Sequence, residues 1–421
     1  MKKKVVLVVV IALVGVLVVG CASLVGLLRL GLLTVETESA SRDCEESAEE
    51  LVRFAAMGDE REVSSALERG EDPNVRDEHG NTPLACAGPE GHVEVVRMLL
   101  EAGADVDTRS REGEPVVVDA AIHCRAEVIG EIVEHEPDRR SLATALAWST
   151  RNGDADAVKL LLEAGAEPGA FDEHTAVIVE TSRACETPSS GEWSVIYDAL
   201  LEKGADPDSV LSHAVATGTA DGVKAALAAG ADPETRVDVV GPVTPLWSPA
   251  VAEQGLKEMP TALVVAVSTG RGDIASLLVE AGADPDRESV ALPFRPTGWT
   301  RRSDSCAYLE CDAANQILLR MGAGAVQPPA LPRVTPLMEA TFAGDVLTVR
   351  MLLEAGADPN RPAHAGLTPL HAAAASGSAE VVDALFEAGA APPQSGEWKP
   401  SEVAERSGHR ELAAKLRERG A

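Results

Sequence analysis

The sequence predicts an all-α solenoid built from stacked pairs of short helices. Three observations lead to this prediction: a two-helix pattern recurs along the chain, each copy ends in a Gly-containing turn, and aromatic residues make up only 3% of 421 residues. A solenoid grows by stacking and needs no larger core, so closely packed short helices rich in Ala, Leu and Val can form its interior. We therefore expect one elongated domain, although this length usually indicates two or three.

The clearest copy of the pattern lies at residues 366–390. Thr368 can cap a first helix, and Pro369 suits its first turn, where a missing N–H costs nothing. Gly377 can take the left-handed conformation that ends this helix. A second helix follows, and its apolar residues have the spacing of one helical face before Gly389 closes it. These apolar residues are Val381, Val382, Leu385 and Phe386.

This unit resembles the ankyrin repeat, whose signature is Thr-Pro-Leu-His-x-Ala followed by a second helix that ends in Gly-Ala-Asp. Copies of the closing turn recur at intervals scattered around the ankyrin period of about 33 residues. They begin at Gly70, Gly103, Gly165, Gly204, Gly230, Gly282, Gly356 and Gly389, with degenerate copies at Glu136 and Gly322 and a last one at Gly420. The resemblance covers roughly residues 47–421. It implies an ankyrin-repeat solenoid of about ten stacked helix-turn-helix units that binds another protein.

The first 33 residues predict a membrane anchor. Residues 2–4 are lysines, and residues 5–28 contain no charge and are long enough to span a bilayer, which needs about 20 apolar residues. The lysines would stay in the cytoplasm, which places the repeats in the periplasm or at the cell surface. The sequence at 18–21 looks like a bacterial lipobox, so lipidation of Cys21 remains the alternative to an uncleaved transmembrane helix. Both alternatives predict a membrane-tethered protein, of bacterial type.

Residues 34–46 are predicted to form a short acidic tether between this segment and the ankyrin domain at 47–421. Within the domain, three stretches depart from the repeat. They lie at about 170–190, 237–260 and 288–332. We interpret them as irregular insertions, because insertions in solenoids map to loops, often on the binding face.

Two of these insertions carry the residues predicted to bind a partner. Trp and Arg are the residue types most enriched in interface hot spots. The candidate partner-binding residues are Trp247 in one insertion and Phe294, Arg295, Trp299, Arg301 and Arg302 in the other. The alternative is that these side chains pack internally and fill the gap left by a degenerate repeat.

The net charge of −30 argues against binding to nucleic acid, because a phosphate backbone would be repelled. An acidic surface can attract a basic partner, or it can simply keep a carboxylate-rich solenoid soluble. The sequence leaves this choice open.

The sequence lacks the common motifs of hydrolases, metalloproteases and nucleotide-binding enzymes. We therefore predict no enzymatic activity, no metal and no cofactor. His371 is expected to tie its loop together by hydrogen bonds, and the recurrent Asp of the closing turn to bond local backbone groups. This Asp recurs at Asp105, Asp206, Asp232, Asp284 and Asp358.

Seven cysteines include Cys21, and the remaining six could form up to three disulfides. Cys306 and Cys311 are the predicted pair, whereas a buried free thiol is equally compatible with the position of Cys86. The predicted function is a non-catalytic protein–protein interaction scaffold or adaptor on the extracytoplasmic side of a membrane. The alternative is a thiol redox or enzyme-accessory protein that acts through Cys306 and Cys311.

Overall fold

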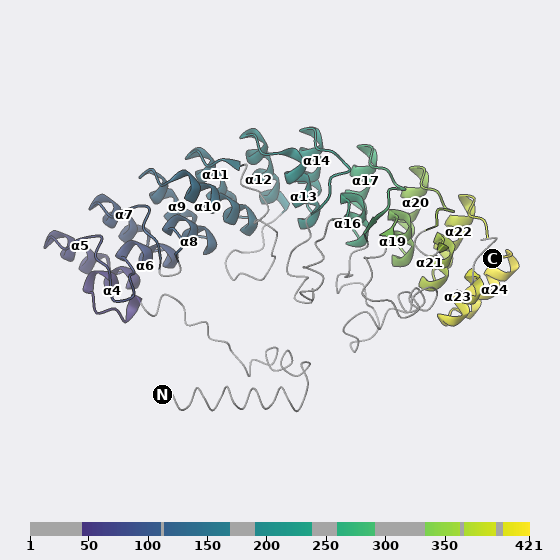
Figure 1. Cartoon of the computed structure of the whole chain (residues 1–421), viewed down its shortest axis with the longest axis horizontal. Coiled ribbons are helices and arrows are strands. Elements are labelled where there is room, and N and C mark those ends of the chain that lie inside the picture. The colour runs from purple at the N-terminus through teal and green to yellow at the C-terminus, as the bar shows by residue number, and fades with distance from the viewer. Residues whose placement is uncertain are drawn as a thin grey trace, which may run out of the picture. The chain divides into compact units, whose positions relative to one another are not determined.

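The computed structural model confirms the all-helical ankyrin-type fold (Figure 1). It describes residues 44–110, 113–168, 190–237, 259–290, 333–362, 366–392 and 399–421. Within these ranges the only strands are two short ones, β1 (Ser289–Val290) and β2 (Arg333–Val334). The chain divides into two compact units, one up to Glu114 and one from Pro115 onward.

The described part of the first unit contains two helix pairs. Their bounds are α4 (Glu50–Met57), α5 (Glu60–Glu68), α6 (Pro83–Glu90) and α7 (Val93–Glu101). The first helices, α4 and α6, pack on each other, and so do the second helices, α5 and α7. Two layers of helices result, with the apolar core between them.

The second unit continues the same arrangement, and Figure 1 shows its two layers. The first-helix layer contains α8 (Val116–Ile122), α10 (Arg139–Asn152), α13 (Pro207–Thr217), α16 (Ala262–Ser268), α19 (Pro336–Ala343), α21 (Pro369–Ser376) and α23 (Pro400–Arg406). The second-helix layer contains α9 (Ala126–Val133), α11 (Ala155–Glu163), α12 (Ser190–Glu202), α14 (Ala220–Ala228), α17 (Gly272–Glu280), α20 (Val346–Glu354), α22 (Ala379–Glu387) and α24 (Arg410–Glu418).

Local sequence explains where these helices begin and end. Thr335 caps α19 by accepting a hydrogen bond from the Met338 N–H at 3.2 Å, and Pro336 occupies the first helical position. Before α21, the N–H of Thr368 donates to Nδ1 of His371 at 3.1 Å, and the Thr368 hydroxyl lies 2.9 Å from the same nitrogen. The predicted structural role of His371 is therefore confirmed.

The recurrent Asp of the closing turn also behaves as predicted. The carboxylate of Asp284 accepts a hydrogen bond from the N–H of Asp286 at 2.9 Å, and Asp358 does the same with Asn360 at 2.9 Å. Such bonds to the backbone two residues ahead stabilise the turn locally. No metal ion is needed to explain the recurring carboxylates.

A second set of hydrogen bonds ties several closing turns to the turn of the next repeat. The side chain of Asn360 accepts from the N–H of Ala391 at 2.7 Å and donates to the carbonyl oxygen of Gly389 at 3.2 Å. Asn74 makes the equivalent pair of bonds with Asp105 and Gly103, at 2.7 and 3.1 Å. This turn ladder satisfies backbone groups and fixes the register between neighbouring repeats.

Histidines at the turn between the two helices provide another inter-repeat contact. Nε2 of His92 donates to the carbonyl oxygen of Ala56 at 2.9 Å, and Nε2 of His409 donates to that of Ala375 at 3.2 Å. Each ring lies over a glycine of the preceding repeat, at which a Cβ would overlap the ring. The glycine is Gly58 for His92 and Gly377 for His409. These two histidines therefore have a structural role.

The first unit contains a disulfide between Cys44 and Cys86, whose Cα atoms are 6.1 Å apart. Both cysteines are buried against Val52 and Ala56, so Cys86 is a disulfide partner and its free-thiol alternative is excluded. Cys124 is also disulfide-bonded.

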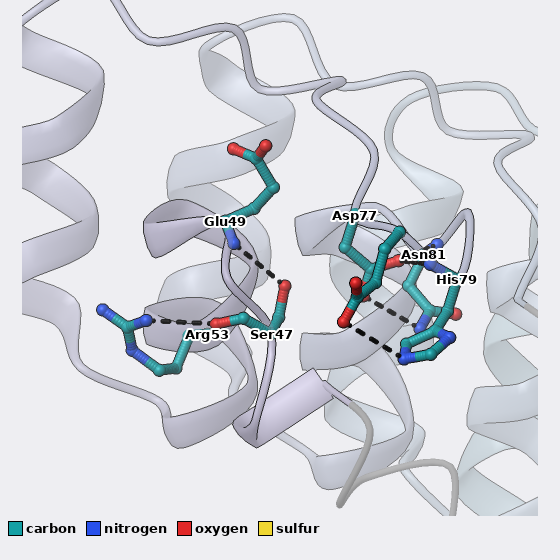
Figure 2. A network of polar contacts seen from close by, with 7 residues as sticks. Ser47, Glu49, Arg53, Asp77, His79 and Asn81 are labelled. Carbon is teal, nitrogen blue, oxygen red and sulfur yellow. Dashed lines mark hydrogen bonds and ion pairs between the residues drawn. The ribbon is translucent and has the colours of Figure 1, made fainter.

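A polar network in the same unit fixes the turn that precedes α6 (Figure 2). Asp77 is buried, and its carboxylate accepts from the N–H groups of His79 and Asn81 at 2.9 and 2.8 Å. The Asn81 amide donates a third bond at 3.2 Å. Figure 2 also shows Arg53 donating to the carbonyl oxygen of Ser47, at 3.1 Å. A buried carboxylate is tolerated here because these donors replace its water shell.

The prediction of a membrane-anchored protein with an extracytoplasmic ankyrin domain is corrected. A spanning helix needs about 20 apolar residues, and no helix in the described part of the chain is long and apolar enough. The longest described helix, α10, has 14 residues and contains three arginines. The predicted anchor at 1–33, with Cys21, and most of the predicted tether at 34–46 lie outside the described residues.

The third repeat departs from its neighbours at two backbone positions. Cys124 and Glu136 both have a φ of 55°, and they are the only non-glycine residues with positive φ in the described ranges. The residues 33 positions earlier are Gly91 and Gly103, which have φ of 87° and 90°. Side chains with a Cβ are strained in this left-handed region.

We predict that Glu136→Gly stabilises the protein by about 0.5–1 kcal/mol, because glycine removes the left-handed strain at an exposed position. Urea denaturation measures the change. The matched control is Glu134→Gly, where φ is −67° and glycine should instead lower the free energy of unfolding. Equal effects of the two substitutions would contradict the prediction.

A buried aromatic cluster joins α12, α13 and α14. The Tyr197 hydroxyl lies 2.9 Å from Nδ1 of His213 and 2.9 Å from the Thr217 hydroxyl. Trp193 stacks on Tyr197 with ring centroids 5.7 Å apart. Gly222 makes room for the tyrosine ring, because a Cβ there would overlap it. Burial raises the pKa of Tyr197 and lowers the pKa of His213 to about 4.

The pKa of His213 predicts a loss of stability in mild acid. Between about pH 6.5 and pH 4 the unfolded chain binds a proton at His213 that the folded chain does not, so the free energy of unfolding falls as pH falls. We expect a loss on the order of 2–3 kcal/mol over this range. Urea denaturation at pH 7.5 and pH 5 measures it, with His213→Asn as the control that removes the titrating group. An unchanged pH dependence in that variant would refute the assignment.

Candidate interaction surface

The residues predicted to bind a partner lie outside the described residues. They are Trp247, Phe294, Arg295, Trp299, Arg301 and Arg302. The predicted disulfide between Cys306 and Cys311 also lies outside, as does nearly all of the insertion predicted at about 170–190. The structure does describe the points where the other two insertions leave and rejoin the repeats, and these points form the candidate surface.

The insertion that carries Trp247 begins and ends at one stem. The N–H of Val237 donates to the carbonyl oxygen of Pro260 at 2.9 Å, and the N–H of Ala262 donates to that of Thr235 at 2.9 Å. Arg236 and Thr261 form an antiparallel bridge between these bonds. The chain therefore leaves the turn before α16 and returns to the same place, which we call the first stem (residues 235–237 and 259–262).

The insertion that carries Trp299 begins and ends at a second stem, formed by β1 and β2. These strands are antiparallel, with Ser289 opposite Val334 and Val290 opposite Arg333. On the core side, Val334 is buried with Val264, Met338 and Leu367.

The repeats on either side of the second stem stack directly on each other. Helix α16 packs on α19, and α17 packs on α20. The N–H of Asp358 donates to the carboxylate of Asp286 at 3.0 Å, which continues the turn ladder across 72 residues of sequence. Gly322, predicted to be the closing turn of a degenerate repeat, lies outside the described residues.

The two stems lie side by side. The N–H of Thr261 in the first stem donates to the hydroxyl of Ser289 in the second at 2.9 Å, and both residues are buried. Both insertions with candidate partner-binding residues therefore start from adjacent points on one edge of the second unit.

Charged side chains join the turns around the stems. Glu234 accepts from the N–H of Asp284 at 2.6 Å and pairs with Arg287 at 3.1 Å. Arg361 lies 4.0 Å from Glu288. Exposed ion pairs add little stability, but together with the turn ladder they hold the bases of the two insertions in a fixed relation.

A simple signal in the sequence could have located both stems. In regular repeats the Thr that caps the first helix follows the recurrent Asp by ten residues, as from Asp358 to Thr368. The separation is 29 residues from Asp232 to Thr261 and 51 from Asp284 to Thr335. The extra residues therefore lie in sequence between the closing turn of one described repeat and the first helix of the next.

The described residues contain no cluster of His, Cys, Asp and Glu that could hold a metal ion. His123 and Cys124 are adjacent in sequence, but Nδ1 of His123 lies 2.8 Å from the carbonyl oxygen of Asp119 and Cys124 is disulfide-bonded. This cysteine therefore has no thiolate that could act as a nucleophile.

Comparison with known proteins agrees with this architecture. A model of three consecutive ankyrin repeats matches residues 27–110, 306–396 and 337–421, and a single-repeat model matches 142–173. The chain is 32% identical over 146 residues to mouse "SH3 and multiple ankyrin repeat domains protein 1", which covers 33% of this chain and 7% of that protein.

Two further relatives show the same partial similarity. The "Probable E3 ubiquitin-protein ligase XBOS33" of Oryza sativa is 33% identical over 35% of this chain and 30% of its own length. The Caenorhabditis elegans "Ankyrin repeat and KH domain-containing protein mask-1" is 31% identical over 30% of this chain and 5% of its own length. The chain thus spans less than a third of these relatives.

These relatives come from animals and a plant, so the comparisons do not support the prediction that the protein is bacterial. They likewise do not support the predicted periplasmic or cell-surface placement. The family models and the paired helices rest on the same feature, the repeated first helix, second helix and closing turn. The chain belongs to the ankyrin repeat family.

Proposed function

We propose that this protein is a non-catalytic scaffold or adaptor that binds another protein through its two insertions. The anchors of the interface would be Trp247, Phe294, Arg295, Trp299, Arg301 and Arg302. Trp and Arg contribute large shares of binding energy at the centres of interfaces.

The observation that carries this proposal is the adjacency of the two stems, joined by the bond from Thr261 to Ser289. Loops that project from a rigid scaffold are a common place for binding residues. Because α16 and α19 stack directly, the insertion between them is not needed to fill the stack, which weakens the alternative of internal packing. Membership of the ankyrin repeat family, whose repeats generally bind other proteins, supports the same conclusion.

The alternative of a thiol redox function through Cys306 and Cys311 gains no support from the described residues. There, Cys44, Cys86 and Cys124 are all disulfide-bonded. Cysteines held in disulfides present no free thiolate for redox chemistry. We therefore do not propose this function.

We predict that replacing residues 291–332 with a two-residue Asn-Gly turn leaves the fold intact and abolishes partner capture. The paired ends of β1 and β2 can be joined by such a turn. The measurements are the thermal melting temperature and crosslinking followed by pulldown with the full chain. Trp299→Ala should likewise reduce capture without lowering the melting temperature.

The matched control replaces residues 291–332 with a Gly-Ser segment of equal length. It should also lose capture, because it keeps the loop length but removes the aromatic and arginine side chains. Capture of the same protein by all three variants would place recognition on the regular repeats. Unchanged capture together with a lower melting temperature for Trp299→Ala would show that this side chain packs internally.

A further inference from the structure

Helix α10 differs in charge from the rest of this acidic protein. It contains Arg139, Arg140 and Arg151 and no Asp or Glu. It is the only helix in the described ranges that has Lys or Arg without a carboxylate. In a chain of net charge −30, α10 is therefore a local positive region.

The positive residues share one face with an aromatic side chain. Arg140, Thr144, Trp148 and Arg151 lie four, four and three residues apart, which places them on one side of an α-helix. Arg140 and Thr144 are exposed, whereas Trp148 and Arg151 are half-buried. The Arg151 guanidinium lies over the Trp148 ring, 4.5 Å from its centroid. We call these four residues the α10 face.

Packing within the repeat does not require a tryptophan at this position. Trp148 precedes the glycine that ends its helix by five residues. The equivalent residues are the small, buried Cys86 and Ala372 in α6 and α21, and the half-buried Arg53 and Glu339 in α4 and α19. The position therefore varies between repeats, and in α10 it holds a half-buried tryptophan beside an arginine. Such an arrangement is typical of an interface anchor.

Helix α10 is also longer at its N-terminal end than the first helices α6 and α21. Helices α6 and α21 begin eight residues before their closing glycine, whereas α10 begins fourteen residues before Gly153. The additional turns start where Asp138 caps the helix by accepting from the N–H groups of Arg140 and Ser141. They bring Arg139 and Arg140 to the surface. Arg139 is 90% exposed, and its contact with Glu167 is long, at 3.9 Å.

We propose that the α10 face binds an acidic, extended peptide segment of a protein partner. This inference rests on the proposed function, which identifies the partner as a protein. Charge complementarity with the arginines indicates that the bound segment is acidic. Arginine forks bind carboxylates in bidentate geometry, and the exposed part of the indole ring can cover an apolar side chain.

The helix geometry specifies the spacing in that peptide. Arg140 and Arg151 are separated by eleven residues of helix, which is about 16 Å. An extended peptide covers this distance in about five residues. Trp148 lies about 4.5 Å along the axis from Arg151. The segment should therefore carry carboxylates about five residues apart and an apolar residue near one of them.

Fluorescence polarisation with the full chain tests the proposal. The probe is a labelled peptide, Glu-Glu-Ala-Ala-Leu-Ala-Glu, and its counterpart has Lys in place of each Glu. We expect the acidic peptide alone to bind, with an affinity that falls as salt rises. The double variant Arg140→Glu/Arg151→Glu should weaken binding by at least about tenfold, and Trp148→Ala should also weaken it.

The matched control is Arg350→Glu, which reverses a partly exposed arginine on α20 in the same unit. It should change affinity by less than about twofold, because it lies outside the α10 face. Melting temperatures confirm that each variant is folded. Equal binding of both peptides, or equal effects of Arg350→Glu and the double variant, would overturn the proposal. A single-stranded oligonucleotide that displaces the peptide equally well would also overturn the assignment to a peptide.

The chain that lacks residues 291–332 separates this inference from the proposed function. If both hold, it loses the partner protein but still binds the acidic peptide through the α10 face. If it keeps the partner protein, the proposed function fails while the peptide result still decides the α10 proposal. If the double variant binds the peptide as the wild type does, only the α10 proposal fails.

Discussion

The hydrogen bond from one closing turn to the next is the constraint on which the repeat stack depends. At five turns a side chain two residues beyond the Asp of the turn accepts from a backbone N–H of the following turn; these side chains are Asn74, Asp208, Glu234, Asp286 and Asn360. The two helix layers give apolar burial, but apolar burial alone is non-directional. The ladder adds register, because a backbone donor left unpaired at this point would carry a desolvation cost.

This constraint explains why the stack tolerates long insertions. Each repeat contacts mainly its neighbours, so the chain between two turns can lengthen without disturbing the stack. The bond from Asp358 to Asp286 shows this, since it joins turns that are 72 residues apart in sequence. Lengthening a loop adds only a slowly growing entropic cost. Insertions between turns can therefore add binding residues without changing the helices. The proposed α10 face differs, because its binding residues lie on a helix of the repeat itself.

The sequence predicted the fold well because the repeat is encoded locally. Thr-Pro at helix starts, Gly at helix ends and Asp in the turns act through neighbouring residues, as the bond between Thr368 and His371 illustrates. It predicted the candidate site only in part. The degenerate repeat predicted to end at Gly322 lies outside the described residues, and closing turns alone do not reveal which repeats are in contact. Extracytoplasmic placement rested on hydropathy of residues 1–33 and is corrected.

The sequence by itself determined the helix pairs, their order and the structural roles of His371 and the recurrent Asp residues, since these depend on contacts within one repeat. Only the tertiary structure decided which repeats stack across the insertions, that Cys86 pairs with Cys44, and that Tyr197 and His213 meet. It also decided that Trp148 stays partly exposed. The physical reason is that these features join residues 16 to 72 positions apart, and local spacing carries no information about such contacts.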